Sequence, residues 1–449
     1  MKRSLAVAAA IVLPASAASA SSPAPSVVPV AFPGAEGAGR LSAGGRGGAV
    51  LKVTTLADDG PGSLRAAIDA RGPRTILFDV SGTIFLQSDL VIREPRATIA
   101  GQSSPGGGVT IANHGLVIRA DDVVVRFIRA RRGDRGGEGD SIWVAGGERI
   151  ILDHVTASWS TDETLSVSGP RDAASPRDVT VQWSIIADSL RRSVHGKGEH
   201  GYGSLVRGSR GAAYSFHHNL WANHQARMPR PGNYLPPEED ADGPVMEFRS
   251  NLFHNWGGFA SGYNSDSGAR ARYSIIDNSY SPGPDSKGLF AFREENPGAQ
   301  AWFAGNSLAG KVPEDPWTLV QGAERPGYRL AGPVSAGPVA ADPPARAADR
   351  ILARAGASCV RDALDLALIS DVRAGRGRLI DSQDEVGGWP VLASAPVLQD
   401  SDGDGVPDEA ERIAGTDPKR PDSALTAGDD GITHLEVWLA ALASRCQGG

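Results

Sequence analysis

Short runs of β-branched and aromatic residues recur between about residues 75 and 310, and Gly, Asp, Asn and Ser separate them. Examples are residues 74–80, 123–128, 150–155, 179–183, 213–218 and 245–248. Such composition, with turn-forming residues at both ends of each run, is typical of β-strands. No long stretch with helical periodicity interrupts the series. The pattern therefore predicts an all-β domain.

The runs form a loose repeat, because many are followed by a corner such as Asn219-Leu220 or Asn251-Leu252. Aligning equivalent positions gives steps of 27, 30, 35, 32, 23 and 32 residues, for Ile128, Val155, Ile185, Leu220, Leu252, Ile275 and Ser307. Variable steps indicate a solenoid with loop insertions, whereas a propeller would repeat at roughly 40 residues and a sandwich would show hairpin turns. Asn at a repeated corner tolerates left-handed backbone and can stack in a ladder. A parallel β-helix is predicted, and its handedness does not follow from this pattern.

The segments that flank the repeat have a different character. Residues 60–68 predict a short helix that caps the first rung, and residues 344–356, 360–369 and 431–442 predict helices beyond the repeat. We therefore expect a solenoid domain at 31–340 and a C-terminal extension at 341–449.

The N-terminus has the pattern of a secretory signal. Lys2-Arg3 precedes a short apolar core at residues 5–13 and a small-residue cleavage site at residues 18–20. Residues 1–20 are predicted to be the signal peptide and residues 21–30 a Ser/Pro-rich lead. The apolar core is too short to span a bilayer, and no later segment is long and apolar enough. A secreted protein without a membrane partner is expected.

Composition and cysteine content agree with an exported, folded chain. Apolar residues make up 41% of the 449, with 56 Gly and 31 Pro, which indicates a turn-rich globular protein. The formal charge is −7, and no nucleic-acid partner is expected. Cys359 and Cys446 are the only cysteines, and in an exported chain a disulfide between them is the natural interpretation. Two free buried thiols are the alternative.

The C-terminal extension contains a strong metal motif. Asp400, Asp402, Asp404, the Val406 carbonyl, Asp408 and Glu411 fall at positions 1, 3, 5, 7, 9 and 12, with Gly405 at position 6. This is the ligand spacing of an EF-hand-like calcium loop. The loop is predicted to bind a structural Ca²⁺, and an acidic solvated turn is the alternative.

Residues 190–235 form a strongly basic segment. They hold seven Lys or Arg, one acid (Glu199) and five of the nine His, within a chain of net charge −7. Such a local field requires an anionic partner or a nearby acidic cluster.

Acidic residues lie upstream, and Asp140 and Asp162 are 22 residues apart, which is about one minimal rung. On a solenoid, positions one rung apart stack, so both carboxylates can reach one groove. Clustered carboxylates repel one another unless a cation neutralises them. A cation that bridges these acids to an anionic substrate is predicted, although each Asp alone is more typical of a turn.

Arg227 and Arg230 flank Pro229, whose ring stiffens the backbone between two guanidinium groups. Guanidinium forks suit carboxylates, so this pair is a candidate for binding an acidic substrate, with a solvated basic loop as the alternative.

Four short motifs in this order together resemble the secreted pectate lyases of the first polysaccharide lyase family. They are residues 32–39 (FPGAEGAG), 151–154 (ILDH), 159–163 (WSTDE) and 227–229 (RMP). The resemblance implies a right-handed parallel β-helix that cleaves polygalacturonate or pectin by β-elimination with Ca²⁺. It also implies an enzyme that we expect to act as a monomer.

Carried onto this chain, the resemblance implies that Asp140 and Asp162 bind calcium and that Arg227 removes the C5 proton. It places Asp153 and His154 beside the site in a supporting role. Some relatives have a further calcium carboxylate where this chain has Ser166, and Glu163 is expected to compensate.

Two further positions depart from the family pattern. The second arginine of the Arg-x-Pro-x-x-Arg motif is replaced by Gly232, and Arg230 is expected to bind substrate instead. The active-site lysine of the family has no secure match, but Lys197 and His200 lie in the corresponding loop and are predicted to bind substrate.

Two other functions compete with the lyase. A β-helix polygalacturonase-type hydrolase would use a carboxylate pair such as Asp162 and Glu163, and would leave the Arg227 motif without a role. A non-catalytic glycan-binding surface protein would bind the polymer without turnover.

Overall fold

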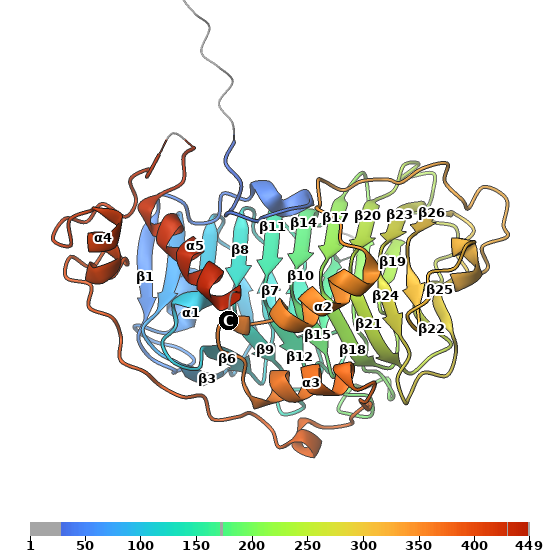
Figure 1. The fold of residues 1–449 in the computed structure, drawn as a ribbon, viewed down its shortest axis with the longest axis horizontal. Coiled ribbons are helices and arrows are strands. Elements are labelled where there is room, and N and C mark those ends of the chain that lie inside the picture. The colour runs from blue at the N-terminus through green and yellow to red at the C-terminus, as the bar shows by residue number, and fades with distance from the viewer. Residues whose placement is uncertain (1–27, 171–173, 429, 448–449) are drawn as a thin grey trace, which may run out of the picture.

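A computed structural model describes residues 28–170, 174–428 and 430–447. The predicted signal peptide at 1–20 and most of the lead at 21–30 lie outside the described residues. The described chain is a parallel β-helix whose strands run across its long axis and stack side by side along that axis (Figure 1).

Three long sheets form the walls of this helix, and the chain passes from sheet C to sheet A to sheet B in successive rungs. Sheet A contains β1 (Ala49–Val53), β2 (Arg74–Phe78), β5 (Ala97–Ala100), β8 (Val123–Arg126), β11 (Glu148–Asp153), β14 (Arg177–Gln182), β17 (Ala213–His217), β20 (Val245–Arg249), β23 (Ala271–Ile276) and β26 (Ala299–Ala304). Sheet B contains β3 (Gly82–Phe85), β6 (Val109–Ala112), β9 (Arg129–Arg131), β12 (Thr156–Ser158), β15 (Ile185–Ala187), β18 (Leu220–His224), β21 (Leu252–Trp256), β24 (Ser279–Ser281) and β27 (Ser307–Leu308). Sheet C contains β4 (Leu90–Ile92), β7 (Leu116–Ile118), β10 (Ile142–Val144), β13 (Leu165–Ser168), β16 (Leu205–Gly208) and β19 (Arg230–Asn233). A fourth, shorter sheet contains β22 (Ala260–Asn264), β25 (Phe290–Glu294) and β28 (Val320–Gln321).

The interior of the helix is filled by side chains that stack from rung to rung. Trp221, Phe253 and Tyr280 form one column, with ring centroids 4.9 and 4.8 Å apart. Because parallel strands place equivalent residues at the same height, one apolar position repeated per rung builds a continuous core.

An asparagine ladder holds the corner between sheets A and B, as the repeat predicts. The Oδ1 of Asn251 accepts the N–H of Asn219 at 2.9 Å, and Asn278 and Asn306 continue the series. The left-handed backbone of this corner is one residue earlier than expected, for example at His218, where φ is 56°. The asparagine then remains free to bond to its neighbours.

The strand register corrects three of the aligned positions. Thr156 lies opposite both Arg129 and Ile185, so Ile128 and Val155 were each placed one residue too early, and Ile275 was placed on the wrong sheet. Leu252 lies opposite Ser279, whereas Ile275 belongs to sheet A. Ile275 was aligned because it is apolar like Leu252, whereas the equivalent residue on sheet B is the polar Ser279.

The N-terminal motif at residues 32–39 packs on the outside of sheet A. Phe32 and Ala35 lie against Val124 and Ile151. A Cβ at Gly39 would lie 2.0 Å from the Ile150 carbonyl oxygen, so only glycine permits this close approach. The motif therefore covers a sheet and does not reach the opposite corner of the helix.

Helices lie along the outside of the solenoid (Figure 1); α1, α2, α3 and α5 correspond to the four predicted helices, whereas α4 and the 3-10 helices were not predicted. The α-helices are α1 (Leu64–Asp69), α2 (Pro344–Arg354), α3 (Ala363–Arg373), α4 (Asp408–Ala414) and α5 (His434–Gln447). The 3-10 helices are η1 (Ala38–Leu41), η2 (Gly101–Ser103), η3 (Pro316–Leu319), η4 (Ser358–Val360) and η5 (Gln383–Val386). Among the described residues, none of the helices is long and apolar enough to cross a membrane.

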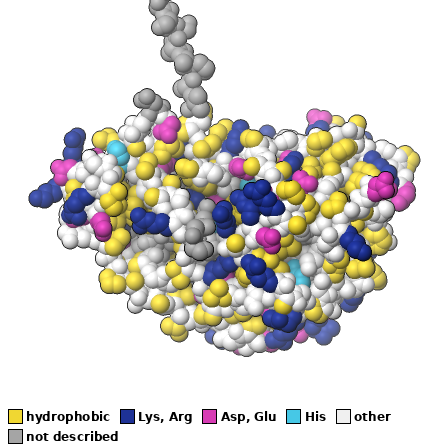
Figure 2. Space-filling view, viewed as in Figure 1, with side chains coloured by type: hydrophobic (Ala, Val, Ile, Leu, Met, Phe, Trp, Pro, Cys, Tyr) yellow, Lys and Arg dark blue, Asp and Glu magenta, His cyan; other side chains and the backbone are white. Residues whose placement is uncertain are grey.

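The C-terminal extension returns to the first rungs. In α5, Leu435 and Leu439 pack on Leu77 and Ala100 of sheet A, and Lys52 of β1 pairs with Asp400 at 2.6 Å. The predicted disulfide between Cys359 and Cys446 is confirmed, with a sulfur–sulfur distance of 2.00 Å. On the face that carries α2 and α5, Lys and Arg side chains lie in separate groups among acids and apolar surface (Figure 2).

Candidate active site

The candidate site is built on the loops that lead from sheet B into sheet C. Residues 132–141, 159–164, 188–204 and 225–229 precede β10, β13, β16 and β19, respectively. Because neighbouring strands of sheet C are parallel, these loops stack at the same edge of the sheet. The predicted catalytic acids and bases all fall within them.

Three carboxylates meet at this edge. Asp140, Asp162 and Glu163 each offer an oxygen within 4.8 Å of the others, and the Glu163 N–H donates to Asp140 Oδ1 at 3.2 Å. Burial and the nearby Asp162 charge raise the pKa of Asp140 well above its ordinary value. The one-rung spacing of the sequence therefore does bring these acids together.

Arg227 lies directly beside this carboxylate cluster. Its guanidinium forms an ion pair with Glu163, lies 4.0 Å from the centre of the Tyr202 ring, and donates from Nε to the Tyr263 hydroxyl at 3.4 Å. The Arg227 carbonyl accepts the Ser204 N–H at 2.7 Å, which fixes the backbone of the loop against the start of β16. The arginine is thus held by contacts on several sides.

Arg230 begins β19 and points along the same edge. Its guanidinium lies 3.7 Å from Asp266 and donates to Ser265 Oγ at 3.3 Å. Burial and the Arg207 charge lower the pKa of Arg230.

The structure explains why an arginine is missing at position 232. A Cβ at Gly232 would lie 2.2 Å from Asp266 Oδ2, because the ion pair between Arg207 and Asp266 occupies that space. Arg207 lies opposite Gly232 in the strand register.

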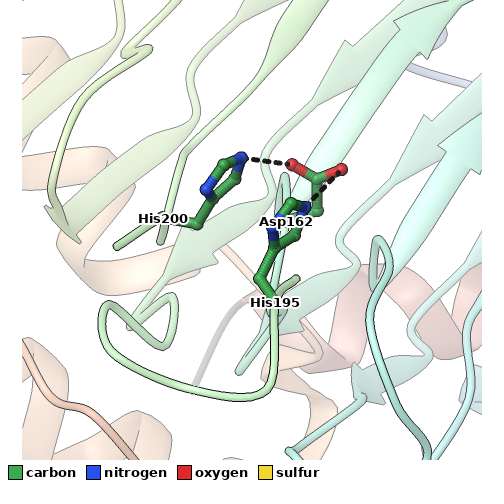
Figure 3. A group of neighbouring side chains, drawn as sticks. All are labelled: Asp162, His195 and His200. Carbon is green, nitrogen blue, oxygen red and sulfur yellow. Dashed lines mark ion pairs between the residues drawn. The ribbon is translucent and has the colours of Figure 1, made fainter. Parts of the chain in front are cut away.

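The loop at residues 188–204 places two histidines against Asp162 (Figure 3). The rings of His195 and His200 stack with centroids 3.6 Å apart, and Tyr202 lies next in the column at 4.6 Å from His200. Lys197 is exposed in the same loop, and its backbone N–H donates to His195 Nδ1 at 3.1 Å. His195, Tyr202 and Tyr263 were not predicted, although His195 lies in the basic segment and could have been proposed from its position.

Internal acids neutralise much of the basic segment. Arg191 pairs with Asp381 at 3.1 Å, and Arg192 pairs with Glu199 at 3.4 Å. The local charge count therefore overestimates the field that a substrate meets.

Asp153 and His154 do not lie in these loops. Asp153 ends β11 at the corner between sheets A and B, where Arg126 donates to it at 2.7 Å and Gln182 at 2.8 Å. Burial alone would raise the pKa of Asp153, but the charges of His154 and Arg126 lower it below its ordinary value. The expectation that this pair supports the site is therefore wrong, and its role is to hold the corner.

The acidic loop of the C-terminal extension contains two groups of carboxylates. Asp400, Asp402 and Asp404 form the first group and Asp404, Glu411 and Asp422 the second. Glu411 is only 1% exposed, and among the described residues neither of its carboxylate oxygens has a hydrogen-bond partner. A buried, unpartnered carboxylate that faces other acids fits a cation site.

Asp408, in contrast, does not join either group. Its carboxylate accepts hydrogen bonds from the N–H and the hydroxyl of Ser401, at 2.7 and 2.8 Å. Asp422, which follows Glu411 by 11 residues, faces the cluster instead and was missed because it lies outside the 12-residue motif.

Comparisons with known proteins agree with this architecture. The chain is 37% identical to the probable pectate lyase C of Aspergillus fumigatus, over 92% of this chain and 94% of the relative. It is 35% identical to the probable pectate lyase C of Emericella nidulans, over 92% and 93%.

Among solved structures, a mutant pectate lyase of Bacillus subtilis has a TM-score of 0.51 at 13% identity, covering 73% of this chain and 98% of that chain. A second pectate lyase, described with its anti β-elimination mechanism, has a TM-score of 0.50 at 13% identity, covering 72% and 96%. Residues 400–421 match the model of the bacterial TSP3 repeat. The likeness to the solved structures shows the shared fold.

Proposed function

The chain belongs to the pectate lyase family, and on that premise we propose that it cleaves polygalacturonate by calcium-assisted β-elimination. As a member it is a polysaccharide lyase. The observation that carries the proposal is the cluster of Asp140, Asp162 and Glu163 directly beside Arg227.

The donor set suits calcium. Asp140, Asp162 and Glu163 offer only carboxylate oxygens, which are the ligands that Ca²⁺ prefers. The raised pKa of Asp140 reflects repulsion and burial that a cation would relieve. When bound, the ion would neutralise these acids and the carboxylate of the uronate next to the scissile bond.

Arg227 is the candidate base for the C5 proton of the uronate. An arginine guanidinium is ordinarily protonated and cannot accept a proton, so its neutral form must first become accessible. The ion pair with Glu163 stabilises the charged form, and Arg227 can act as a base only when that pairing is relaxed. The contacts with Tyr202 and Tyr263 keep the guanidinium in place during that change.

Arg230, His200 and Lys197 are proposed to bind the substrate. Arg230 and Lys197 offer positive charge to uronate carboxylates. His200 directs its Nε2 at Asp162, 3.5 Å from the Oδ1 atom.

A hydrolase is less consistent with the site. It would need one carboxylic acid that stays protonated and one ionised carboxylate flanking the bond. Glu163 forms an ion pair with Arg227, and the hydrolase leaves that arginine without a role.

The remaining expectations follow from the same proposal. Asp400, Asp402, Asp404 and Glu411 hold a structural Ca²⁺ with Asp422 in place of Asp408. Export through the segment at 1–20 is supported by the disulfide, since such bonds persist in oxidising compartments. We further propose a monomer with a lyase domain at 31–340 and an extension at 341–449.

Ultraviolet absorbance tests the function directly, because β-elimination yields an unsaturated product and hydrolysis does not. Purified chain is incubated with polygalacturonate or methylated pectin, in calcium or in a chelator, while absorbance and reducing ends are measured. Both signals should rise together in calcium only. Reducing ends without absorbance would indicate a hydrolase, and polymer binding without either signal would indicate a binding protein.

A further inference from the structure

A second group of potential metal ligands lies beside the carboxylate cluster and contains nitrogen donors. His195 Nε2 lies 3.7 Å from Asp162 Oδ2, and His200 Nε2 lies 3.5 Å from Asp162 Oδ1 (Figure 3). These separations exceed the roughly 2.7–3.2 Å of an N–H···O hydrogen bond. They are close to the distance of about 3.4 Å between two ligands of one tetrahedral ion with bonds near 2.1 Å.

The tautomer of His200 leaves a lone pair on Nε2. Its Nδ1 lies 3.1 Å from the Glu199 carbonyl oxygen, and a carbonyl can only accept, so Nδ1 carries the proton. A ligating histidine typically donates its other N–H to such a backbone carbonyl. A neutral nitrogen then faces a carboxylate, and a cation between them would satisfy both.

His195 supplies the second nitrogen after a local adjustment. Its Nδ1 accepts the Lys197 N–H, and its ring is stacked on His200 with 10° between the planes. Coordination through Nε2 moves the ring proton to Nδ1, breaks that one hydrogen bond and turns the two rings apart. Val194 and Gly196 on either side are exposed, so the loop has room for this rotation.

A fourth donor lies at the rim. Glu138 Oε2 is 3.9 Å from His195 Nε2 and accepts the Gly196 N–H at 3.0 Å. Two imidazoles and two carboxylates form a mixed nitrogen and oxygen set, which favours Zn²⁺ and similar transition metals over Ca²⁺.

We propose that Asp162, His195 and His200, with Glu138 at the rim, form a binding site for a divalent transition metal such as Zn²⁺. Asp162 belongs to this set and to the carboxylate cluster. Where that cluster holds calcium, as proposed above, a transition metal withdraws one of its ligands and raises the calcium concentration needed for turnover.

The test uses the full-length chain without a polyhistidine tag, stripped of metal by a chelator that is then removed. Co²⁺ is the probe, because tetrahedral cobalt with nitrogen ligands gives strong visible absorption and cobalt bound by oxygen loops gives weak bands. His195→Gln and His200→Gln are compared with His114→Gln. The control His114 faces Asp89 at 3.7 Å, a similar separation, but among residues 28–170, 174–428 and 430–447 it belongs to no group of potential metal ligands.

We expect a strong visible band that Zn²⁺ removes, at least tenfold weaker cobalt binding in His195→Gln and His200→Gln, and unchanged binding in His114→Gln. Thermal melting checks that each variant is folded. If a variant melts at a lower temperature than the parent chain, His200→Asn is used in its place. Equal binding in the His195→Gln, His200→Gln double variant would overturn the proposal, as would no strong band at millimolar cobalt. A missing band with intact calcium-dependent lyase activity refutes only this site, whereas a band without lyase activity refutes only the proposed function.

Discussion

The substitution Glu411→Gln should have opposite effects on stability in the absence and in the presence of calcium. Glu411 is buried in α4, and in the part of the chain that the structure describes neither of its carboxylate oxygens has a hydrogen-bond partner. Other acids surround it. Burial, followed by the charges of Asp402 and Asp404, raises its pKa from 4.5 to about 7. In the absence of a cation, the buried ionised carboxylate therefore destabilises the folded state, and a neutral amide at this position removes that destabilisation.

The structure sets the size of this effect. A pKa of about 7 instead of 4.5 corresponds to at most ~3 kcal/mol above pH 7, and solvent screening around the surface loop reduces it to about 1–2 kcal/mol. The folded state holds the proton more tightly than the unfolded state, so calcium-free stability falls as the pH rises from about 4.5 to about 7. At pH 8 in chelator, Glu411→Gln should be more stable than the parent by about 1–2 kcal/mol.

Calcium reverses the order. An ion at 100 times its dissociation constant stabilises the folded parent by ~2.7 kcal/mol, and a variant that has lost a ligand gains little of this. The variant should then be less stable than the parent by about 1 kcal/mol.

Hydrogen exchange over residues 400–446, followed by mass spectrometry, reports the local opening of this region at each condition. Glu409→Gln is the matched control, because Glu409 lies on the same helix but is exposed, and it should change stability little in either condition. A Glu411→Gln variant that is less stable with and without calcium would refute the cation site.

Three further predictions test the site and the scaffold. Arg227→Lys should lower turnover by on the order of 10²–10⁴ with normal folding, as expected for a positioned base, while Arg249→Lys on sheet A should not; near-normal activity in Arg227→Lys excludes it as the base. Asp140→Ala and Asp162→Ala should each raise the calcium concentration that gives half-maximal ultraviolet activity, and an unchanged calcium titration in both would remove them from the site. Asn251→Ala deletes four side-chain hydrogen bonds of the buried ladder, at about 1 kcal/mol each, so denaturant unfolding should show a loss of about 4 kcal/mol; a loss below about 1 kcal/mol would contradict the ladder's role.

Much of the fold follows from local sequence. β-branched runs identify the strands because each strand of a solenoid buries the same type of residue rung after rung. The assignment of Ile275 to the wrong sheet shows the limit, since apolar residues at neighbouring corners have the same composition and only the register separates them.

The candidate site was predictable where it depends on rung spacing, as for Asp140 and Asp162. It was not predictable where it depends on long-range contacts. Arg191 pairs with Asp381, which is 190 residues away in the sequence. Asp422 joins the cluster of Asp404 although it lies outside the 12-residue calcium motif. Charge counted along the sequence cannot reveal such pairings, because the fold decides which charges meet.

The return of α5 to the first rungs has a consequence for how the protein is made. Leu77 and Ala100 are synthesised early, whereas the residues that pack on them, Leu435 and Leu439, are among the last to leave the ribosome. If export is vectorial, these early rungs keep an apolar face open until almost the whole chain has crossed. A chain truncated before α5 would therefore leave this face bare, and exposed apolar surface of this kind promotes aggregation. Packing of α5 is thus the final folding step, and it covers the apolar face of the rungs that were synthesised first.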